Sequence, residues 1–274
     1  KEFLIISSAT MQPRDLYWIK KSIKENEKVF VTDLTSAYTV LSLQGPRSRE
    51  ILSKLTKTDL SNDGFPFATS QEIEIGYTNV IANRLTYIGE LGWEIFIPVE
   101  YSLNVFDNLM RVGEECGLKP AGYHALEHLR SERAYREYEL DLTPEDTPLE
   151  AGLGFTIDWN KPGGFVGLEA LLKQKENGLL KKRLVCFRLV DTKTALWHEE
   201  IIYRNNKIVG YVSSGAYSFN LGSSVALGYV KNIDGISNEF IENGNWEIES
   251  AGVRYKAEAN LKPFYDPNGE KIKG

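Results

Sequence analysis

The pattern of apolar residues changes near residue 178, and this change limits the folds that the chain can adopt. Upstream, several segments carry apolar side chains at helical spacing. Downstream, apolar residues alternate over short runs that Asn and Gly turns separate. Asn205-Asn206 lies between two such runs and predicts a hairpin, because asparagine tolerates a positive φ. We therefore expect an α+β part, residues 1–175, followed by a smaller all-β part, residues 176–274.

The first part contains patterns for both helices and strands. Its expected helices cover residues 13–25, 46–55, 100–117, 121–138 and 165–178. Its expected strands cover residues 3–8, 28–35, 38–45, 71–77, 80–87 and 92–98. In the third helix Gly117 suits the C-terminal cap, and the apolar stripe consists of Leu103, Phe106, Leu109 and Met110. Expected strands of the second part cover residues 182–190, 200–214, 224–230 and 246–261.

Composition and charge argue against several classes of protein. The 274 residues are 42% hydrophobic and 26% charged, which suffices for a packed core. The net charge of −6 argues against sequence-independent nucleic-acid binding, which needs a basic surface. No apolar run approaches the roughly 20 residues of a membrane span. Cys116 and Cys186 are the only cysteines, so we expect no disulfide framework and two inert packing residues.

Glu94 is unusual because it lies inside the strand pattern GWEIFIP. If residues 84–87 and 93–98 form a symmetric hairpin, Tyr87 pairs with Glu94, and their side chains share one face of the sheet. A phenol and a carboxylate would then stand side by side, as in the wall of a pocket. The pattern by itself favours a simpler alternative, a solvated glutamate on the outer face of the hairpin.

Two further patterns have structural explanations that we favour. His124 and His128 fit H-x-x-E-H and would share one helix face, as zinc ligands do. That pattern is short and no third ligand stands out, so we expect no metal site. His198 is expected at the surface or in the core, beside Trp197.

The charge-rich segment 131–141, SERAYREYELD, is expected to be a solvated helix face with Glu132 and Arg136 paired four residues apart. Tyr135 and Tyr138 are favoured as core residues, and packing on a ligand is the alternative. Glu150 is expected to accept hydrogen bonds from backbone N–H groups at a helix start.

Several ordered motifs resemble the folate-binding aminomethyltransferase family. TYIGELGWEI resembles its motif Y-[TS]-G-E-x-G-[aromatic]-E. VLSLQGPRSREIL, AGYHALEHLRSERAYREY with TPLEAGLGF, FVGLEALLKQK and SSGAYSFNLGSSVALGYV resemble its further motifs in the same order. The family includes the glycine cleavage T-protein and the C-terminal halves of dimethylglycine and sarcosine dehydrogenases. The resemblance implies an α+β aminomethyltransferase-like domain with antiparallel sheets and helices, followed by a small C-terminal β-barrel.

The resemblance also implies a binding site for tetrahydrofolate. Residues matching Tyr87 and Glu94 line the folate pocket of the family. A carboxylate accepts two parallel N–H donors at once, and the pteridine edge offers a ring N–H and an amino group. Arg130 is expected to face the same pocket, and Tyr217 to approach the folate tail from the β part.

Two departures from the family pattern bear on catalysis. Leu126 occupies a position where the T-protein has an arginine, and the dehydrogenase branch carries an apolar residue. The family's proposed catalytic Asp lies just before the segment that KEFLIISS resembles, and FAD binds in a domain further upstream. The chain has no initiator Met and no features of a signal peptide, so we expect a fragment or a processed product. Its catalytic residues are therefore not assigned.

The resemblance thus predicts the tetrahydrofolate-binding region of a flavoprotein of the mitochondrial matrix. The full-length protein would act on a small methylated amine and capture a one-carbon unit as methylenetetrahydrofolate. Several stretches, among them YRNNKIVGYVSSGAYSFNL, also resemble the regulatory subunit of pyruvate dehydrogenase phosphatase. The alternative is therefore a non-catalytic regulatory protein that contacts the catalytic subunit of a phosphatase.

Overall fold

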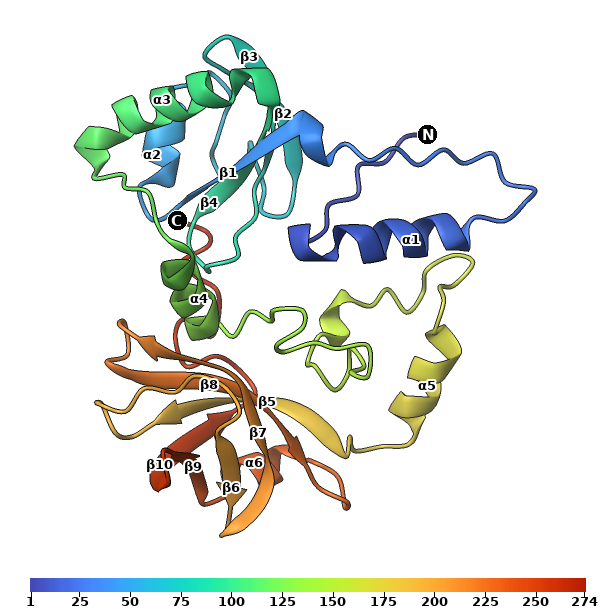
Figure 1. Ribbon diagram of the computed structural model, residues 1–274, viewed down its shortest axis with the longest axis vertical. Coiled ribbons are helices and arrows are strands. Elements are labelled where there is room, and N and C mark those ends of the chain that lie inside the picture. Colours follow the sequence, from blue (N-terminus) through green and yellow to red (C-terminus); the bar gives the residue numbers. More distant parts are fainter.

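The computed structural model describes all 274 residues and has the predicted fold class. Figure 1 shows a sheet with helices at the top and a barrel at the bottom, with α4 (Tyr123–Glu132) between them. No helix is both long enough and apolar enough to cross a bilayer.

The upper sheet has four antiparallel strands in the order β1-β4-β3-β2. The strands are β1 (Tyr38–Gln44), β2 (Ser70–Ile75), β3 (Thr78–Asn83) and β4 (Gly92–Pro98). Trp93, Ile95 and Ile97 of β4 are fully buried on one face, which α2 (Ser48–Ser53) and α3 (Ser102–Gly113) cover. The even-numbered residues of β4, including Glu94, therefore point to the opposite face.

The predicted apolar stripe of α3 is partly wrong. Leu109 is buried as expected, and Gly117 adopts the expected left-handed conformation with φ of 72°. Leu103, however, is 71% exposed, and Val105 is completely buried. The helix is apolar over a wide arc, so contact with the sheet selects which part of that arc is buried.

The lower part is a closed barrel in the strand order β10-β5-β8-β7-β6-β9. Its strands are β5 (Lys182–Leu189), β6 (Ile201–Arg204), β7 (Lys207–Ser218), β8 (Ser223–Lys231), β9 (Trp246–Ser250) and β10 (Val253–Asn260). Asn205 and Asn206 have φ of 49° and 64°, which confirms the predicted hairpin turn. A short helix that the sequence pattern did not indicate, α6 (Asn238–Glu242), begins at Ser237, whose hydroxyl accepts a hydrogen bond from the Phe240 N–H.

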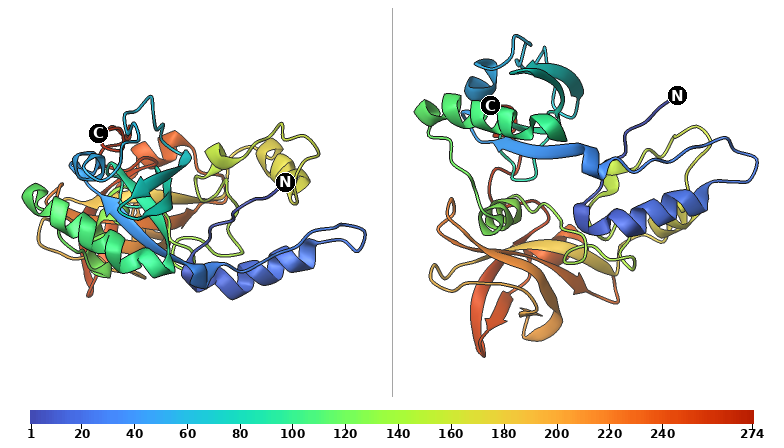
Figure 2. Two further views of the ribbon diagram at one scale, coloured as in Figure 1. Left: turned by 90° about the horizontal axis from the view of Figure 1, so that it is seen from above. Right: turned by 45° about the horizontal axis from the view of Figure 1, so that its top comes forward.

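The strands predicted at residues 3–8 and 28–35 are wrong. Only α1 (Gln12–Ser22) and two short 3-10 helices, Ala9–Met11 and Thr35–Ala37, form in the first 37 residues. Figure 2 shows this arm projecting from the sheet. A strand needs a neighbour for its backbone hydrogen bonds, and no strand of the chain pairs with these residues.

The helix predicted at residues 121–138 ends early, at Glu132. Ala134 has a φ of 54°, so the chain leaves the helix there and folds back between the sheet and the barrel. The predicted helix at 165–178 is present as α5 (Leu168–Glu176), after an irregular stretch with one 3-10 turn, Gly154–Thr156.

The last residues of the chain return from the barrel to the upper sheet, where Figure 1 places the C-terminus. Asp266 forms an ion pair with Arg133 at 3.1 Å. The Lys273 carbonyl accepts hydrogen bonds from Arg49 and Arg84. These contacts fasten the C-terminal segment to the end of α4, to α2 and to the loop that follows β3.

Candidate functional site

Glu94 lies on the open face of the upper sheet, in a central strand. It stands opposite Ser42 of β1 and Asn83 of β3. The predicted hairpin that pairs Tyr87 with Glu94 is therefore wrong, because β3 ends at Asn83 and residues 84–91 form a loop. The Leu85 N–H bonds to the Asn83 carbonyl in a tight turn at the end of β3, and Arg84 is 2% exposed and donates to Phe65 O and Asn62.

The carboxylate of Glu94 has no partner in the chain. It is half-buried and makes neither a hydrogen bond nor an ion pair, and burial alone raises its pKa above the ordinary value. Two neighbouring amides also have buried unpaired atoms, Asn83 Nδ2 and Gln44 Oε1. Buried unpaired atoms such as those of the two amides are uncommon in folded proteins unless a ligand or water satisfies them, and the half-buried carboxylate lies beside them. The geometry therefore argues against the fully solvated glutamate that the pattern by itself favoured.

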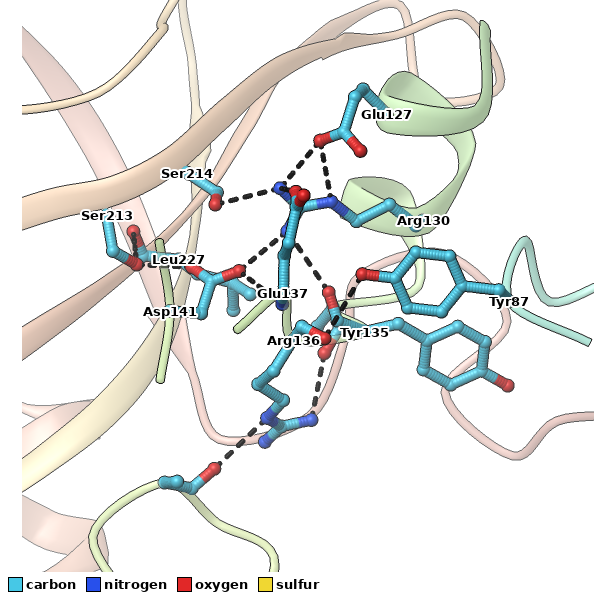
Figure 3. A network of polar contacts seen from close by, with 12 residues as sticks. Tyr87, Glu127, Arg130, Tyr135, Arg136, Glu137, Asp141, Ser213, Ser214 and Leu227 are labelled. Carbon is cyan, nitrogen blue, oxygen red and sulfur yellow. Dashed lines mark hydrogen bonds and ion pairs between the residues drawn. The ribbon is translucent and has the colours of Figure 1, made fainter. Parts of the chain in front are cut away.

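Tyr87 is held in place by the segment that follows α4. Its hydroxyl donates to the Arg136 carbonyl at 3.1 Å, and its ring stacks on Tyr135 with centroids 6.2 Å apart. Figure 3 shows this pair beside the cluster around Arg130. Burial raises the pKa of Tyr87, so its hydroxyl stays protonated and can donate.

Arg130 is the centre of a buried ionic cluster (Figure 3). Its guanidinium is 1% exposed and contacts three carboxylates, Glu127 at 2.7 Å, Glu137 at 3.0 Å and Asp141 at 2.6 Å. Burial opposes the positive charge, but Asp141 and Glu127 outweigh it and hold the pKa of Arg130 above its ordinary value. Each guanidinium nitrogen already has an acceptor, so the direct contact with a ligand that we expected for Arg130 has no free N–H available.

Asp141 extends the cluster into the barrel. It is completely buried and accepts hydrogen bonds from the Glu137 N–H and the Ser213 hydroxyl. Ser214 accepts a hydrogen bond from Arg130 at 3.0 Å, so β7 is attached at two adjacent residues. The cluster thereby joins α4, the segment after it and the barrel.

The solvated helix face predicted for residues 131–141 is thus wrong. Glu132 is buried and accepts from Asn220, and Arg136 donates to the carbonyls of Ala134 and Ala151, so the expected pair between them does not form. The acids of the cluster stand three, seven and eleven residues from the arginine in sequence. In an ideal helix, residues seven and eleven positions away would share a face with the arginine but lie two and three turns from it, out of contact, so only the fold shows that they converge.

Tyr217 lies on β7 at the side of the barrel that faces α4. Its carbonyl meets His128 Nδ1 at 3.1 Å, and its ring packs edge-on against Phe219. His124 lies near Trp197, and His128 stacks on Phe219 at 5.8 Å. No group of three or more His, Cys, Asp or Glu side chains is arranged to hold a metal ion.

Other expected residues have local roles. Glu150 accepts a hydrogen bond from the Thr147 N–H at 3.0 Å, so it bonds the backbone as expected, but in a turn and not at the start of a helix. Cys186 is buried among apolar residues, and burial raises its pKa to about 12, as expected of an inert thiol. The Cys116 thiol donates to Glu50 at 3.2 Å. His198 is exposed beside Trp197.

Comparison with protein families identifies the class of this fold and site. Residues 1–161 match the GCVT N-terminal domain, and residues 182–266 match the glycine cleavage T-protein C-terminal barrel domain. The chain therefore belongs to the glycine cleavage T-protein family. The crystal structure of glycine cleavage system aminomethyltransferase T from Bartonella henselae shares the fold, with a TM-score of 0.78 over 94% of this chain and 67% of that chain, at 22% identity.

Curated relatives fall into three kinds. Human mitochondrial sarcosine dehydrogenase is 41% identical over 86% of this chain and 26% of its own length. The mouse mitochondrial pyruvate dehydrogenase phosphatase regulatory subunit is 38% identical over 96% of this chain and 31% of its own length. The aminomethyltransferase of Thermoanaerobacter sp. (strain X514) is 36% identical over 98% of this chain and 70% of its own length. The chain thus spans about a quarter to a third of the first two relatives.

Replacing Arg130 with methionine tests the cluster. Arg130→Met leaves three carboxylates together in a largely buried place, so we expect unfolding free energy to fall by about 3–5 kcal/mol in urea titrations at pH 7. Arg188→Met is the matched control, since Arg188 pairs with Glu258 at the surface of β5, and it should cost less than about 1 kcal/mol. Equal losses in the two variants would show that the cluster has no special role.

The unpaired charge of Glu94 should reduce the stability of the ligand-free protein. A carboxyl whose pKa is raised by folding binds its proton more tightly in the folded state, so the ionised form destabilises the fold above that pKa. Glu94→Gln should therefore raise the unfolding free energy at pH 7 by up to about 1 kcal/mol. The gain should vanish as pH falls through the raised pKa toward the ordinary value of 4.5.

Glu72→Gln is the control for this measurement, because Glu72 is exposed on β2 and faces the same side of the sheet. It should leave stability unchanged across the same pH range. Destabilisation by Glu94→Gln at pH 7 would mean that the carboxylate supports the fold and has a partner in solution.

Proposed function

We propose that this chain binds tetrahydrofolate through Glu94 and Tyr87, as the folate region of a larger dimethylglycine or sarcosine dehydrogenase-like protein. The observation that carries the proposal is the Glu94 carboxylate, which is half-buried in a central strand and has no partner in the chain. An acceptor without a partner in the chain costs stability, and a bound ligand that supplies the donors offsets that cost.

The chemistry of the pteridine edge suits Glu94. That edge presents a ring N–H and an amino group side by side, and the two oxygens of one carboxylate can accept both bonds. The pairing is charge-assisted, so it is stronger than a bond between neutral groups. A neutral amide in the place of Glu94 offers only one acceptor oxygen, and its amino group would oppose the second donor.

Tyr87 would form one wall of the binding site, and the ionic cluster would keep it there. The Tyr87 hydroxyl is bonded to Arg136 O, and its ring rests on Tyr135, both in the segment that Arg130 and Asp141 anchor. Arg130 therefore acts in this proposal as a positioning residue. Tyr217 remains a proposed contact for the folate tail, on the side where α4 meets the barrel.

In the larger protein, FAD bound outside this chain would supply the oxidation of the N-methyl group of a small amine. This chain would hold tetrahydrofolate so that its nucleophilic ring nitrogen meets the activated carbon, and positioning of that kind can account for a large part of a rate enhancement. The product would be methylenetetrahydrofolate. The names of the human and mouse relatives support a location in mitochondria, and we propose the matrix.

A regulatory function is the second candidate. The mouse phosphatase regulatory subunit is 38% identical over 96% of this chain, and human dimethylglycine dehydrogenase is also 38% identical. This alternative predicts a stable complex with the catalytic subunit of a phosphatase and no affinity for folate.

A titration with tetrahydrofolate separates the two candidates. Following tryptophan fluorescence, we expect saturable binding to the full-length protein and about tenfold to a hundredfold weaker binding in Glu94→Gln. Glu72→Gln should bind like the parent. Absence of binding by a folded full-length protein would contradict the proposal and favour the regulatory function.

A further inference from the structure

A second candidate site lies at one end of the barrel, away from Glu94. A cleft of about 380 Å³ opens between the start of β5, the end of α5 and the loop before α6. Its lining includes Gly152, Gly154, Lys175, Leu180, Arg183 and Ile236. This volume is at the lower end of the range for small-molecule sites, which are often found in the mouths of β-barrels.

Arg183 points toward the interior of the barrel at this end. Side chains alternate along β5, and Val185, Phe187 and Leu189 all belong to the barrel core. Arg183 lies two residues before Val185, on the same face, and pairs in register with the buried Val230. The guanidinium therefore lies at the mouth of the barrel, where the core meets the cleft.

The guanidinium of Arg183 has no partner in the chain. It makes no hydrogen bond and no ion pair, and burial alone lowers its pKa, so no nearby anion compensates its charge. Other cations of β5 are paired: Lys182 contacts Asp146 at 2.5 Å and Arg188 contacts Glu258 at 2.8 Å. Arg183 is only partly buried, so it is distinguished from Lys182 and Arg188 by the missing partner and not by its exposure.

The rest of the cleft has the same electrostatic character. Lys175, in the last turn of α5, has no carboxylate partner, and its ammonium lies over the Trp159 ring at 4.7 Å. Arg136 Nη2, which has no acceptor, borders the lining at Gly152. No aspartate or glutamate lines the cleft, although the chain has a net charge of −6.

We infer that the mouth of the barrel is a binding site for a small anion, a carboxylate or a phosphate, with Arg183 as its main donor and Lys175 as a second cation. A guanidinium can hold either group through two parallel N–H bonds. The glycines of the lining leave room for the anion close to the backbone. None of the lining residues belongs to the sheet that carries Glu94, so this site does not depend on the proposed folate function.

Two probes distinguish the sources of the anion. Sodium phosphate and sodium succinate would each be titrated into the full-length protein at constant ionic strength, with chloride as the balancing anion. Calorimetry and the ¹⁵Nε resonance of Arg183 would report binding. We expect one probe to bind saturably and to shift this resonance, and the probe that does so identifies the phosphate or the carboxylate class.

Variants then test the assignment of the donor. Arg183→Gln should weaken binding about tenfold or more, and Arg183→Lys should retain part of the affinity, since it keeps the charge but loses the planar fork. Arg188→Gln, on the same strand and also only partly buried but paired with Glu258, should bind like the parent. Lys175→Gln tests the contribution of the second cation, which lies on α5 and outside the barrel. Circular dichroism would establish that each variant is folded. Absence of a shift with either probe in the parent, or undiminished binding in folded Arg183→Gln, would overturn the proposal.

Discussion

The buried guanidinium of Arg130 connects the two halves of the molecule. Three carboxylates converge on it, and through Asp141, Ser213 and Ser214 they attach the segment after α4 to the barrel. A buried ion cluster of this kind need not add net stability, because its desolvation can cancel its attraction. Its geometry is nevertheless demanding, and it fixes the backbone that carries Tyr135 and Arg136.

The position of Tyr87 depends on that backbone, whereas the position of Glu94 depends on the sheet. The loop of Tyr87 comes from the upper sheet, and its hydroxyl and ring are held by Arg136 and Tyr135, in the segment that the ionic cluster anchors. Glu94 is fixed by strand pairing on both sides. The proposed folate site therefore combines a rigid acceptor on a central strand with an aromatic wall whose position depends on how the two halves are joined. A site of this design loses its geometry if either support fails.

Local patterns predicted those elements whose stability is mainly local or periodic. The Asn205-Asn206 turn, the buried face of β4 and the barrel strands follow from turn chemistry and alternation. The predicted pairing of Tyr87 with Glu94 is wrong because it assumed a symmetric hairpin, whereas β3 ends at Asn83, which stands opposite Glu94. Pattern alone could not anticipate the loop that follows, because Arg84 and Tyr87 are held there by residues from other segments of the chain.

The prediction of a solvated helix face for the charged segment after α4 was wrong for a related reason. Helical spacing suggested a surface pair between Glu132 and Arg136, but both side chains form other contacts, and Asp141 is completely buried. Charge in a sequence usually indicates solvent, and the exception arises only where several opposite charges meet after folding. The same limit applies to residues 3–8 and 28–35, which are rich in strand-forming residues but have no strand to pair with.

The central claim is that Glu94 is an acceptor kept free for a ligand with two N–H donors. The most direct measurement is the ¹³Cδ chemical shift of Glu94 as a function of pH, with and without tetrahydrofolate. The claim predicts a pKa above the ordinary value of 4.5 in the free protein, because burial disfavours the charge, and a clear decrease when the folate is bound, because its donors stabilise the charge. A pKa at the ordinary value in the free protein, or one that tetrahydrofolate leaves unchanged, would contradict it.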